Sequence, residues 1–387
     1  MLISTNSDLL ILCQDLADAP VLYLDTEFVG EGRYYPDLGA IQVATPDLAA
    51  LVDPIAISNL DPFLDLLADP EREKVFHAAG QDLAIFYRLM GQAMQTVYDT
   101  QLAAALLGPD EQIAFVNLVE RVTGKRLRKE HSFTNWLQRP LAEGQIDYAL
   151  DDVRYLIPIY EAQQKQLAEM GRLEWADEEF TRFERDEAFA PADPTTLFQR
   201  IRNVDRLHGR TLAVLQELVA WREETARNEN IPTGRIARDE VLVELARRPP
   251  DDVKQLRNIR GLTPQQADRW GRQMLQAVRD SMNNPPPPVP HRNSFPPAME
   301  PTVDFLFVCL RSLAVEKSVA PGMVASRGDM SRLAVQGAEA DIPLMRGWRR
   351  ENFGNQLLAT LEGRATARIL PNTREVHLEW LDERPAA

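Results

Sequence analysis

The sequence predicts an α/β domain followed by two all-helical modules. Across residues 1–190, short apolar runs of β-strand character alternate with helix-like periodicity, as is typical of an α/β domain. Residues 196–282 show helical periodicity alone. Residues 283–297 contain a run of four prolines and predict a semi-rigid linker, because proline fits neither helix nor sheet interiors. Residues 298–387 are mostly helical again. The chain of 387 residues is long enough for these domains to have separate cores.

The elements of the first domain follow in order along the chain. Strand-like runs end in polar or acidic residues, and the helical stretches between them carry apolar side chains at helical spacing. The expected strands are Val21–Asp25, Leu38–Ala44, Ala50–Asp53, Lys74–His77 and Val97–Asp99. The expected helices are Leu60–Leu67, Gln81–Met90, Thr100–Leu107, Gln112–Thr123 and Glu143–Met170, and an extended segment is expected in the last module over Leu370–Trp380.

The composition is that of a soluble globular protein, with 44% hydrophobic and 26% charged residues. No run approaches the ~18 consecutive apolar residues that a membrane span needs, so we expect no membrane association. The N-terminal residues lack the pattern of a signal peptide. Cys13 and Cys309 lie in apolar, helix-like stretches and are expected to be buried free thiols. These observations predict a cytoplasmic protein.

The net charge of −15 is unevenly distributed. Residues 1–190 carry 15 Lys and Arg against 33 Asp and Glu, whereas residues 196–282 carry 16 against 12. Basic residues also gather locally, as in the tract from Arg121 to Lys129. An acidic protein with local basic tracts can hold a polyanion with salt-sensitive affinity, so the total charge does not exclude nucleic acid.

An acidic pair, Asp25 and Glu27, stands at the end of the first predicted strand. Because side chains alternate along a strand, both carboxylates point to one face while Thr26 points away. Two adjacent carboxylates repel each other unless a cation lies between them, and oxygen ligands of this kind suit Mg²⁺ or Mn²⁺. Taken alone, such a pair is more typical of a solvated turn than of a metal site.

Further acidic residues follow other strand ends. Asp82 lies where a strand turns into a helix, a position that a metal ligand or a simple partner of the helix dipole could occupy. Asp99 is expected to cap the helix that begins at Thr100. Tyr148 and Asp152 are four residues apart on a predicted helix and therefore share one face.

Taken together, these positions resemble a known family. The order Asp25-Thr-Glu27, Asp82 and Tyr148-x₃-Asp152 is similar to the DEDDy branch of the DnaQ-like 3′→5′ exonucleases, and most of all to the bacterial ribonuclease D family. The similarity extends over the whole chain. It includes Tyr34-Tyr-Pro-x-Leu-x-x-Ile-Gln42, Phe76-His-Ala-x₃-Asp-Leu83, Tyr98-Asp-Thr-Gln-Leu-Ala-Ala104 and Arg139-Pro-Leu141.

The helical modules are consistent with this resemblance. Trp221-Arg-Glu, Ile231-Pro and Leu256-x₂-Ile-x-Gly-Leu262 resemble the helicase-and-RNase-D C-terminal (HRDC) domain, and residues 298–387 occupy the place of a second copy. The sequence departs from the family pattern at Asn135, where an acid is common, and at Gly30 and Gly32. None of these departures touches an expected metal ligand.

The resemblance implies a ribonuclease H-like α/β exonuclease domain and two HRDC-type domains. It further implies two divalent ions, Mg²⁺ or Mn²⁺, held by Asp25, Glu27, Asp82 and Asp152, with Tyr148 orienting the attacking water. The expected reaction is hydrolysis of RNA from its 3′ end to 5′-mononucleotides, in tRNA 3′ maturation and on other structured RNA, by a monomer. A proofreading-type DNA exonuclease and a non-catalytic nucleic-acid adaptor are the alternatives.

Overall fold

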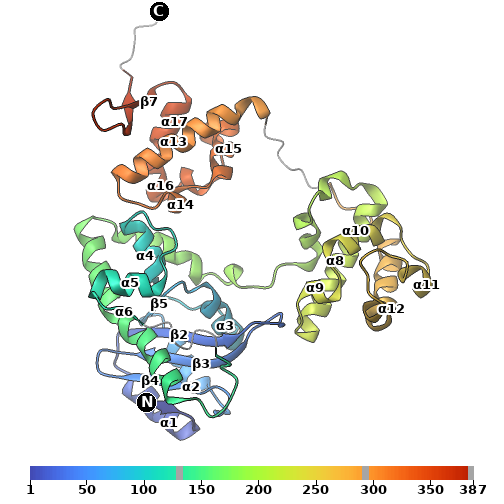
Figure 1. The fold of residues 1–387 in the computed structure, drawn as a ribbon, viewed down its shortest axis with the longest axis horizontal. Helices are drawn as coiled ribbons and strands as arrows, with labels where there is room; N and C mark the ends of the chain where they lie inside the picture. The colour runs from blue at the N-terminus through green and yellow to red at the C-terminus, as the bar shows by residue number, and fades with distance from the viewer. Residues whose placement is uncertain (128–133, 290–295, 382–387) are drawn as a thin grey trace, which may run out of the picture. The chain divides into compact units, whose positions relative to one another are not determined.

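The computed structural model describes residues 1–127, 134–289 and 296–381 (Figure 1). The chain divides into two compact units. Unit 1 comprises residues 1–27, 38–189 and 295–387, and unit 2 comprises residues 28–37 and 190–294. The segment 298–387 was expected to form a separate module, but its described residues are part of unit 1.

A six-stranded mixed sheet forms the centre of unit 1, with the strand order β1-β4-β3-β2-β5-β6. Strands β3 and β4 are antiparallel, whereas β1 pairs with β4, β2 with β5 and β5 with β6 in parallel. The mixed central sheet expected from the sequence is confirmed. The strands are β1 (Leu2–Ile3), β2 (Val21–Val29), β3 (Asp37–Ala44), β4 (Ala49–Val52), β5 (Glu73–Phe76) and β6 (Val97–Asp99).

Helices cover both faces of the sheet. Tyr23 of β2 packs edge-to-face on Tyr160 of α6, and Phe76 of β5 packs on Phe86 of α3. Tyr23 pairs in register with Val75, so Phe76 points to the opposite face, and α6 and α3 therefore lie on opposite sides of the sheet. The helices are α1 (Asn6–Asp15), α2 (Asp61–Ala68), α3 (Gly80–Met90), α4 (Thr100–Leu107), α5 (Phe115–Thr123), α6 (Glu143–Glu169) and α7 (Leu173–Phe180).

The predicted strands and helices of this region are confirmed to within four residues at their ends: β2 runs on to Val29, and one helix starts later than predicted. Helix α5 begins at Phe115 rather than Gln112. The carbonyl of Ile113 accepts hydrogen bonds from His77 and Gln101, and Ala114, just before the helix, has an extended backbone conformation. Strand β1 and helix α7 were not predicted, and α1 was expected only as a helix-like stretch around Cys13.

Unit 2 is helical, as predicted. Its core is built from apolar side chains of α8, α10 and α12, including Leu215, Leu242 and Met274. Tyr34, from the segment 28–37, packs against this core and donates a hydrogen bond to Glu223. The helices are α8 (Gly209–Glu229), α9 (Thr233–Ile236), α10 (Asp239–Arg247), α11 (Val253–Leu256) and α12 (Pro264–Ser281).

The C-terminal part of unit 1 shares a continuous apolar core with the α/β region. Leu306 and Leu310 of its longest helix belong to the same buried cluster as Tyr98 and Phe180. The sequence predicted an extended segment over Leu370–Trp380, and the structure has a two-stranded antiparallel hairpin there, with β7 starting earlier than expected. The elements are α13 (Glu300–Glu316), α14 (Pro321–Val324), α15 (Arg327–Gln336), α16 (Gly347–Arg349), α17 (Asn355–Leu361), β7 (Ala365–Ile369) and β8 (Val376–Trp380).

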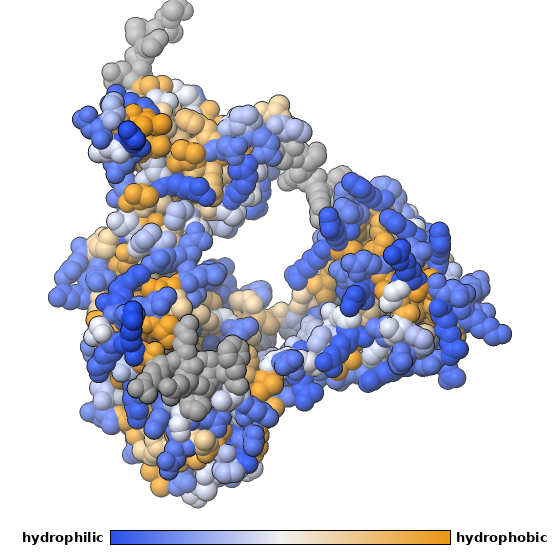
Figure 2. Space-filling model, in the orientation of Figure 1, coloured by the Kyte–Doolittle hydropathy of each residue, from blue (hydrophilic) through white to orange (hydrophobic). Residues whose placement is uncertain are grey.

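No helix in the described ranges is long and apolar enough to cross a membrane. The surface seen in Figure 2 is mostly hydrophilic, with patches of apolar residues, some of them on the C-terminal part of unit 1. Exposed apolar side chains of this part include Phe305, Ile369 and Trp380. Cys13 and Cys309 are free, Cys309 being buried and Cys13 half-buried.

Candidate active site

The acidic pair lies in the second half of β2, at the strand end that faces helix α6. Burial alternates there: Thr26 is 5% exposed, whereas Asp25 and Glu27 are both half-buried. Because Tyr23 faces α6, Asp25 and Glu27 face the same helix. The alternation predicted from the sequence is present, and it directs both carboxylates toward the helix that carries Tyr148 and Asp152.

Asp82 lies in the first turn of α3 and is 6% exposed. The hydroxyl of Thr26 donates a hydrogen bond to its carboxylate, so Asp82 reaches β2 from the α3 side of the sheet. Thr26 was expected only to point away from the acidic pair. Its contact with Asp82 links the first and second acidic segments across 56 positions of sequence.

Helix α6 supplies the third segment. It crosses the sheet with Tyr160 against Tyr23, and Asp152 lies two turns N-terminal of Tyr160, toward the end of β2 that carries the acidic pair. Tyr148 lies one further turn toward the helix start, and its ring is 6.5 Å from the buried ring of Trp136. Tyr148 and Asp152 therefore share the face of α6 that looks onto the sheet.

Electrostatics show that the four carboxylates are close together. Burial, followed by repulsion from Asp82, Asp152 and Glu27, holds the pKa of Asp25 well above its usual range. Burial and the charges of Asp152 and Asp82 raise the pKa of Glu27 to about 8. Burial is also the main cause that raises the pKa of Asp82 to about 6 and that of Asp152 to about 7. A group that favours protons this strongly also favours a cation.

The carboxylates do not yet form a ligand cage. Within residues 1–127, 134–289 and 296–381, no three Asp, Glu, His or Cys side chains have the arrangement of a formed metal site. One oxygen of Asp82 is occupied by the Thr26 hydroxyl. Asp25 is nevertheless near enough to Asp82, Asp152 and Glu27 for their charges to raise its pKa.

Asp99 has a structural role, as predicted. Its carboxylate accepts hydrogen bonds from the backbone amides of Gln101 and Leu102 and caps α4. It also accepts from the amides of Ala78 and Ala79, each at 3.0 Å, just before α3. Ala78 has a φ of 58°, so Asp99 stabilises the unusual turn that leads to Asp82.

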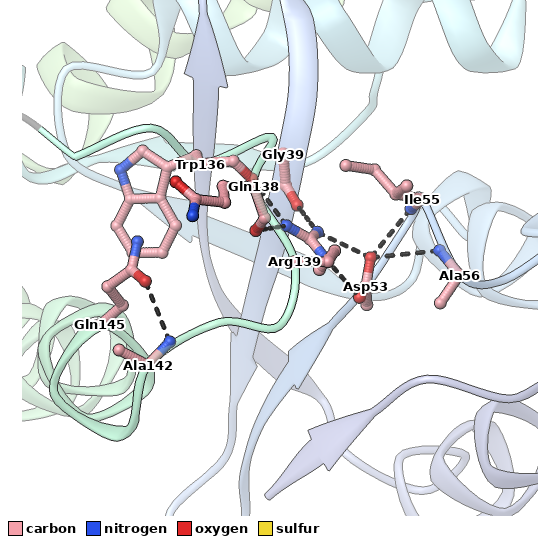
Figure 3. A network of polar contacts seen from close by, with 9 residues as sticks. All are labelled: Gly39, Asp53, Ile55, Ala56, Trp136, Gln138, Arg139, Ala142 and Gln145. Atoms are coloured by element: carbon pink, nitrogen blue, oxygen red, sulfur yellow. Dashed lines mark hydrogen bonds and ion pairs between the residues drawn. The ribbon is translucent and has the colours of Figure 1, made fainter.

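A polar network lies next to Tyr148 that the sequence did not predict (Figure 3). The guanidinium of Arg139 makes a bidentate ion pair with Asp53 at the end of β4, at 2.6 and 2.7 Å. It also donates to the carbonyls of Gly39, Trp136 and Gln138. The only sequence signal was the triplet Arg139-Pro-Leu141.

Asn135 is the position where the sequence departs from the family pattern, which commonly has an acid there. Its side chain accepts a hydrogen bond from the amide of Leu137. The neighbouring residues His131, Ser132 and Phe133 lie outside the described residues.

Comparison with known proteins identifies the family. A family model described as 3′-5′ exonuclease matches residues 1–168, and the HRDC domain model matches residues 211–278. The ribonuclease D of Gluconacetobacter diazotrophicus is 39% identical over 94% of this chain and 93% of its own. The chain belongs to the ribonuclease D family. Ribonuclease D of Granulibacter bethesdensis is 38% identical over 94% of this chain and 92% of its own.

Solved structures agree with this assignment to the ribonuclease D family. The crystal structure of Escherichia coli RNase D, described as an exoribonuclease involved in structured RNA processing, has a TM-score of 0.84 and 30% identity. The match covers 93% of this chain and 98% of the Escherichia coli chain. The catalytic core of RRP6 from Trypanosoma brucei shares the fold, with a TM-score of 0.56, 20% identity and coverage of 73% and 79%. As a ribonuclease D, this chain is a 3′→5′ exoribonuclease with an HRDC domain, and its family generally depends on divalent metal ions.

Proposed function

We propose that Asp25, Glu27, Asp82 and Asp152 hold two divalent ions, Mg²⁺ or Mn²⁺, and that Tyr148 completes the catalytic set. The observation that carries this proposal is repulsion within the set: Asp82, Asp152 and Glu27 raise the pKa of Asp25, and Asp152 and Asp82 raise that of Glu27. Carboxylates that repel one another in this way have charge to share with cations. The donors are all hard oxygen ligands, which suit Mg²⁺ and Mn²⁺ better than softer metals.

The chain's own residues have separate tasks in this reaction. Asp25 is the candidate bridging ligand because it interacts with all three other carboxylates. Glu27 and Asp152 would share one ion, and Asp82 would serve the other, directly or through water. The Tyr148 hydroxyl would orient the attacking water by a hydrogen bond. When bound, paired ions activate water and stabilise the leaving 3′-oxygen.

The proposed substrate is RNA with a free 3′ end, degraded to 5′-mononucleotides, with tRNA precursors as natural targets and other structured RNA as well. The Escherichia coli relative supports this, because its description names structured RNA processing. The surplus of basic residues in the segment 196–282 supports a role of that segment in holding the polyanion.

We further propose the domain roles that the sequence suggested: exonuclease over 1–190, first HRDC domain over 196–282, linker over 283–297 and a second HRDC-like domain over 298–387. The helices of the last segment support a second copy. We propose a monomer in the cytoplasm; the two free cysteines are compatible with a reducing compartment.

A time course on RNA labelled at the 3′ or the 5′ end, with and without Mg²⁺ or Mn²⁺, tests the proposal. Attack from the 3′ end releases a 3′ label immediately as mononucleotide, whereas a 5′ label passes through a ladder of shortening products. Removing the divalent ions with a chelator should stop hydrolysis of both labelled RNAs. The same oligonucleotide as single-stranded DNA serves as the comparison substrate, and equal or faster hydrolysis of the DNA would overturn the assignment to RNA.

A further inference from the structure

Arg139 uses every hydrogen-bonding group that its side chain has. Its Nε–H donates to Asp53, its two Nη2–H groups donate to Asp53 and to the carbonyl of Gly39, and its two Nη1–H groups donate to the carbonyls of Trp136 and Gln138 (Figure 3). A guanidinium has five N–H donors, and all five are satisfied here. The acceptors come from β3, from the end of β4 and from the segment before α6.

The other half of the ion pair is equally constrained. The side chain of Asp53 is 5% exposed, and its Oδ1 also accepts from the backbone amides of Ile55 and Ala56 at 3.0 and 3.2 Å. Hydrogen bonds from Arg139 and from these amides keep the pKa of Asp53 below its usual range despite burial. The carboxylate is therefore charged at neutral pH and fixed in orientation.

Gly39 of β3 also allows the segment before α6, which contains Trp136, to lie close to the sheet. A Cβ added at Gly39 would lie 2.7 Å from the Cβ of Trp136 and 2.8 Å from its carbonyl oxygen. Only glycine permits the backbone of β3 to approach Trp136 this closely. The backbone of Trp136 thus packs on Gly39 while its carbonyl accepts from the Arg139 guanidinium, and the residue is 3% exposed.

Trp136 in turn borders Tyr148. The two rings are 6.5 Å apart with an interplanar angle of 33°. Helix α6 starts within the same segment, where the amide of Ala142 donates to the Gln145 side chain at 3.0 Å. Tyr148 lies only a turn and a half after this start, so the segment 134–142 borders it both through Trp136 and through the beginning of its helix.

We propose that Arg139, together with Asp53 and Gly39, is a positioning residue that fixes Trp136 against Tyr148 and thereby sets the orientation of the Tyr148 hydroxyl. This inference rests on the proposed role of Tyr148. It assigns a function to the Arg-Pro-Leu triplet, which contributes no metal ligand. Arginine is required because lysine has only three N–H donors on one nitrogen and cannot satisfy five acceptors in a planar fork.

The test is a double-mutant cycle between Arg139→Lys and Tyr148→Phe on a short RNA oligonucleotide. Each single variant should lower kcat by about ten- to a hundredfold with little change in KM, because a displaced orienting group affects turnover more than binding. In the Tyr148→Phe background, Arg139→Lys should cost no further activity. If the losses in kcat multiply in the double variant, Arg139 acts independently of Tyr148. That result would overturn the positioning role of Arg139 but not the proposed role of Tyr148. Wild-type activity of Tyr148→Phe would instead overturn the proposed role of Tyr148.

Gly39→Ala displaces Trp136 without replacing either side chain of the Arg139–Asp53 ion pair and should reproduce the Arg139→Lys phenotype. Gly234→Ala is its matched control, because a Cβ there meets nothing within 4 Å. Arg327→Lys, at an exposed pair of ionic contacts, is the control for Arg139→Lys. Should Arg139→Lys unfold, Trp136→Phe takes its place in the cycle.

A second readout does not depend on catalysis. In protein labelled with fluorotyrosine, the ¹⁹F resonance of Tyr148 is identified by its absence from Tyr148→Phe. Arg139→Lys and Gly39→Ala should shift or broaden this resonance in metal-free protein, while Gly234→Ala and Arg327→Lys leave it in place. An unchanged resonance in folded Arg139→Lys and Gly39→Ala would overturn the proposal.

Discussion

The indole rings of Trp175 and Trp348 stack at a centroid distance of 4.6 Å and an interplanar angle of 12°. Trp175 belongs to α7 of the α/β region and Trp348 to α16 of the C-terminal region. Next to them, Arg349 makes a bidentate ion pair with the buried carboxylate of Glu179, which also accepts from the Trp348 indole. Arg172 reaches the carbonyls of Lys317 and Ser318. The C-terminal region is therefore part of the same folded body as the exonuclease sheet.

We expect Trp348→Ala to destabilise the whole of unit 1. Trp348 is 4% exposed, and removing a buried aromatic ring of this kind costs about 3–5 kcal/mol. The free energy of unfolding, measured by chemical denaturation, should fall by that order. Trp380→Ala is the control, since Trp380 is 59% exposed. Equal, small effects of the two substitutions would contradict the shared core.

Asp152→Asn should abolish metal-dependent hydrolysis while leaving the fold intact. Asn keeps the volume of the side chain but removes the charge that a divalent cation needs. The half-buried position of Asp152 makes the substitution structurally mild. The rate of mononucleotide release and the thermal unfolding curve measure the two effects. Asp151→Asn, one residue away on the same helix, should retain activity; activity at the wild-type rate in Asp152→Asn would remove Asp152 from the metal site.

The metal-free protein should lose stability as the pH rises from 5 to 8. The pKa of Glu27 is raised to about 8 and that of Asp152 to about 7, whereas both are near 4 in an unfolded chain. Between these values the folded form binds more protons than the unfolded form, so the free energy of unfolding falls with increasing pH. Asp25→Asn removes a further carboxylate whose own pKa burial and repulsion hold well above its usual range, so it should lessen this dependence.

A divalent metal ion should oppose the loss of stability at high pH. Mg²⁺ binds deprotonated carboxylates, so saturating Mg²⁺ should raise the melting temperature more at pH 8 than at pH 5. Thermal unfolding of the wild type and Asp25→Asn at both pH values, with Mg²⁺ or with a chelator, gives the comparison. The same pH dependence in both proteins would show that the four carboxylates do not titrate together.

Exposed arginines of unit 2 offer a test of RNA holding that leaves unit 1 intact. Arg247, Arg248, Arg257 and Arg260 are all exposed. Replacing them with Gln should weaken binding of a structured RNA and make its affinity less dependent on salt, because fewer counterions are released. Hydrolysis of a short oligonucleotide should be unaffected. Equal losses on both substrates would contradict this division of tasks.

Removing residues 196–387 altogether would not separate a loss of RNA binding from a loss of hydrolysis. Such a truncation also removes Trp348, Arg349 and the buried face of helix α13, whose side chains complete the core of unit 1. Loss of activity would then report unfolding rather than loss of RNA contacts.

Much of the fold could be predicted from local sequence because its causes are local. Thr100–Leu107 was predicted with both ends correct, since Asp99 caps the helix through amides only two and three residues away. Strand β2 and the shared face of Asp25 and Glu27 follow from alternation along one strand. Helix α7 was missed, since its role depends on partners in the distant C-terminal region.

The sequence by itself determined which acids stand at strand and helix ends, and through the resemblance it determined the family. Only the tertiary structure decided what those residues touch. Thr26 meets Asp82 across 56 positions, Arg139 meets Asp53 across 86, and Glu179 meets Arg349 across 170. Local periodicity carries no information about such distances, because each contact exists only where separate elements pack together. The sequence therefore identified the family of this exonuclease, and packing decided how helix α6 is held.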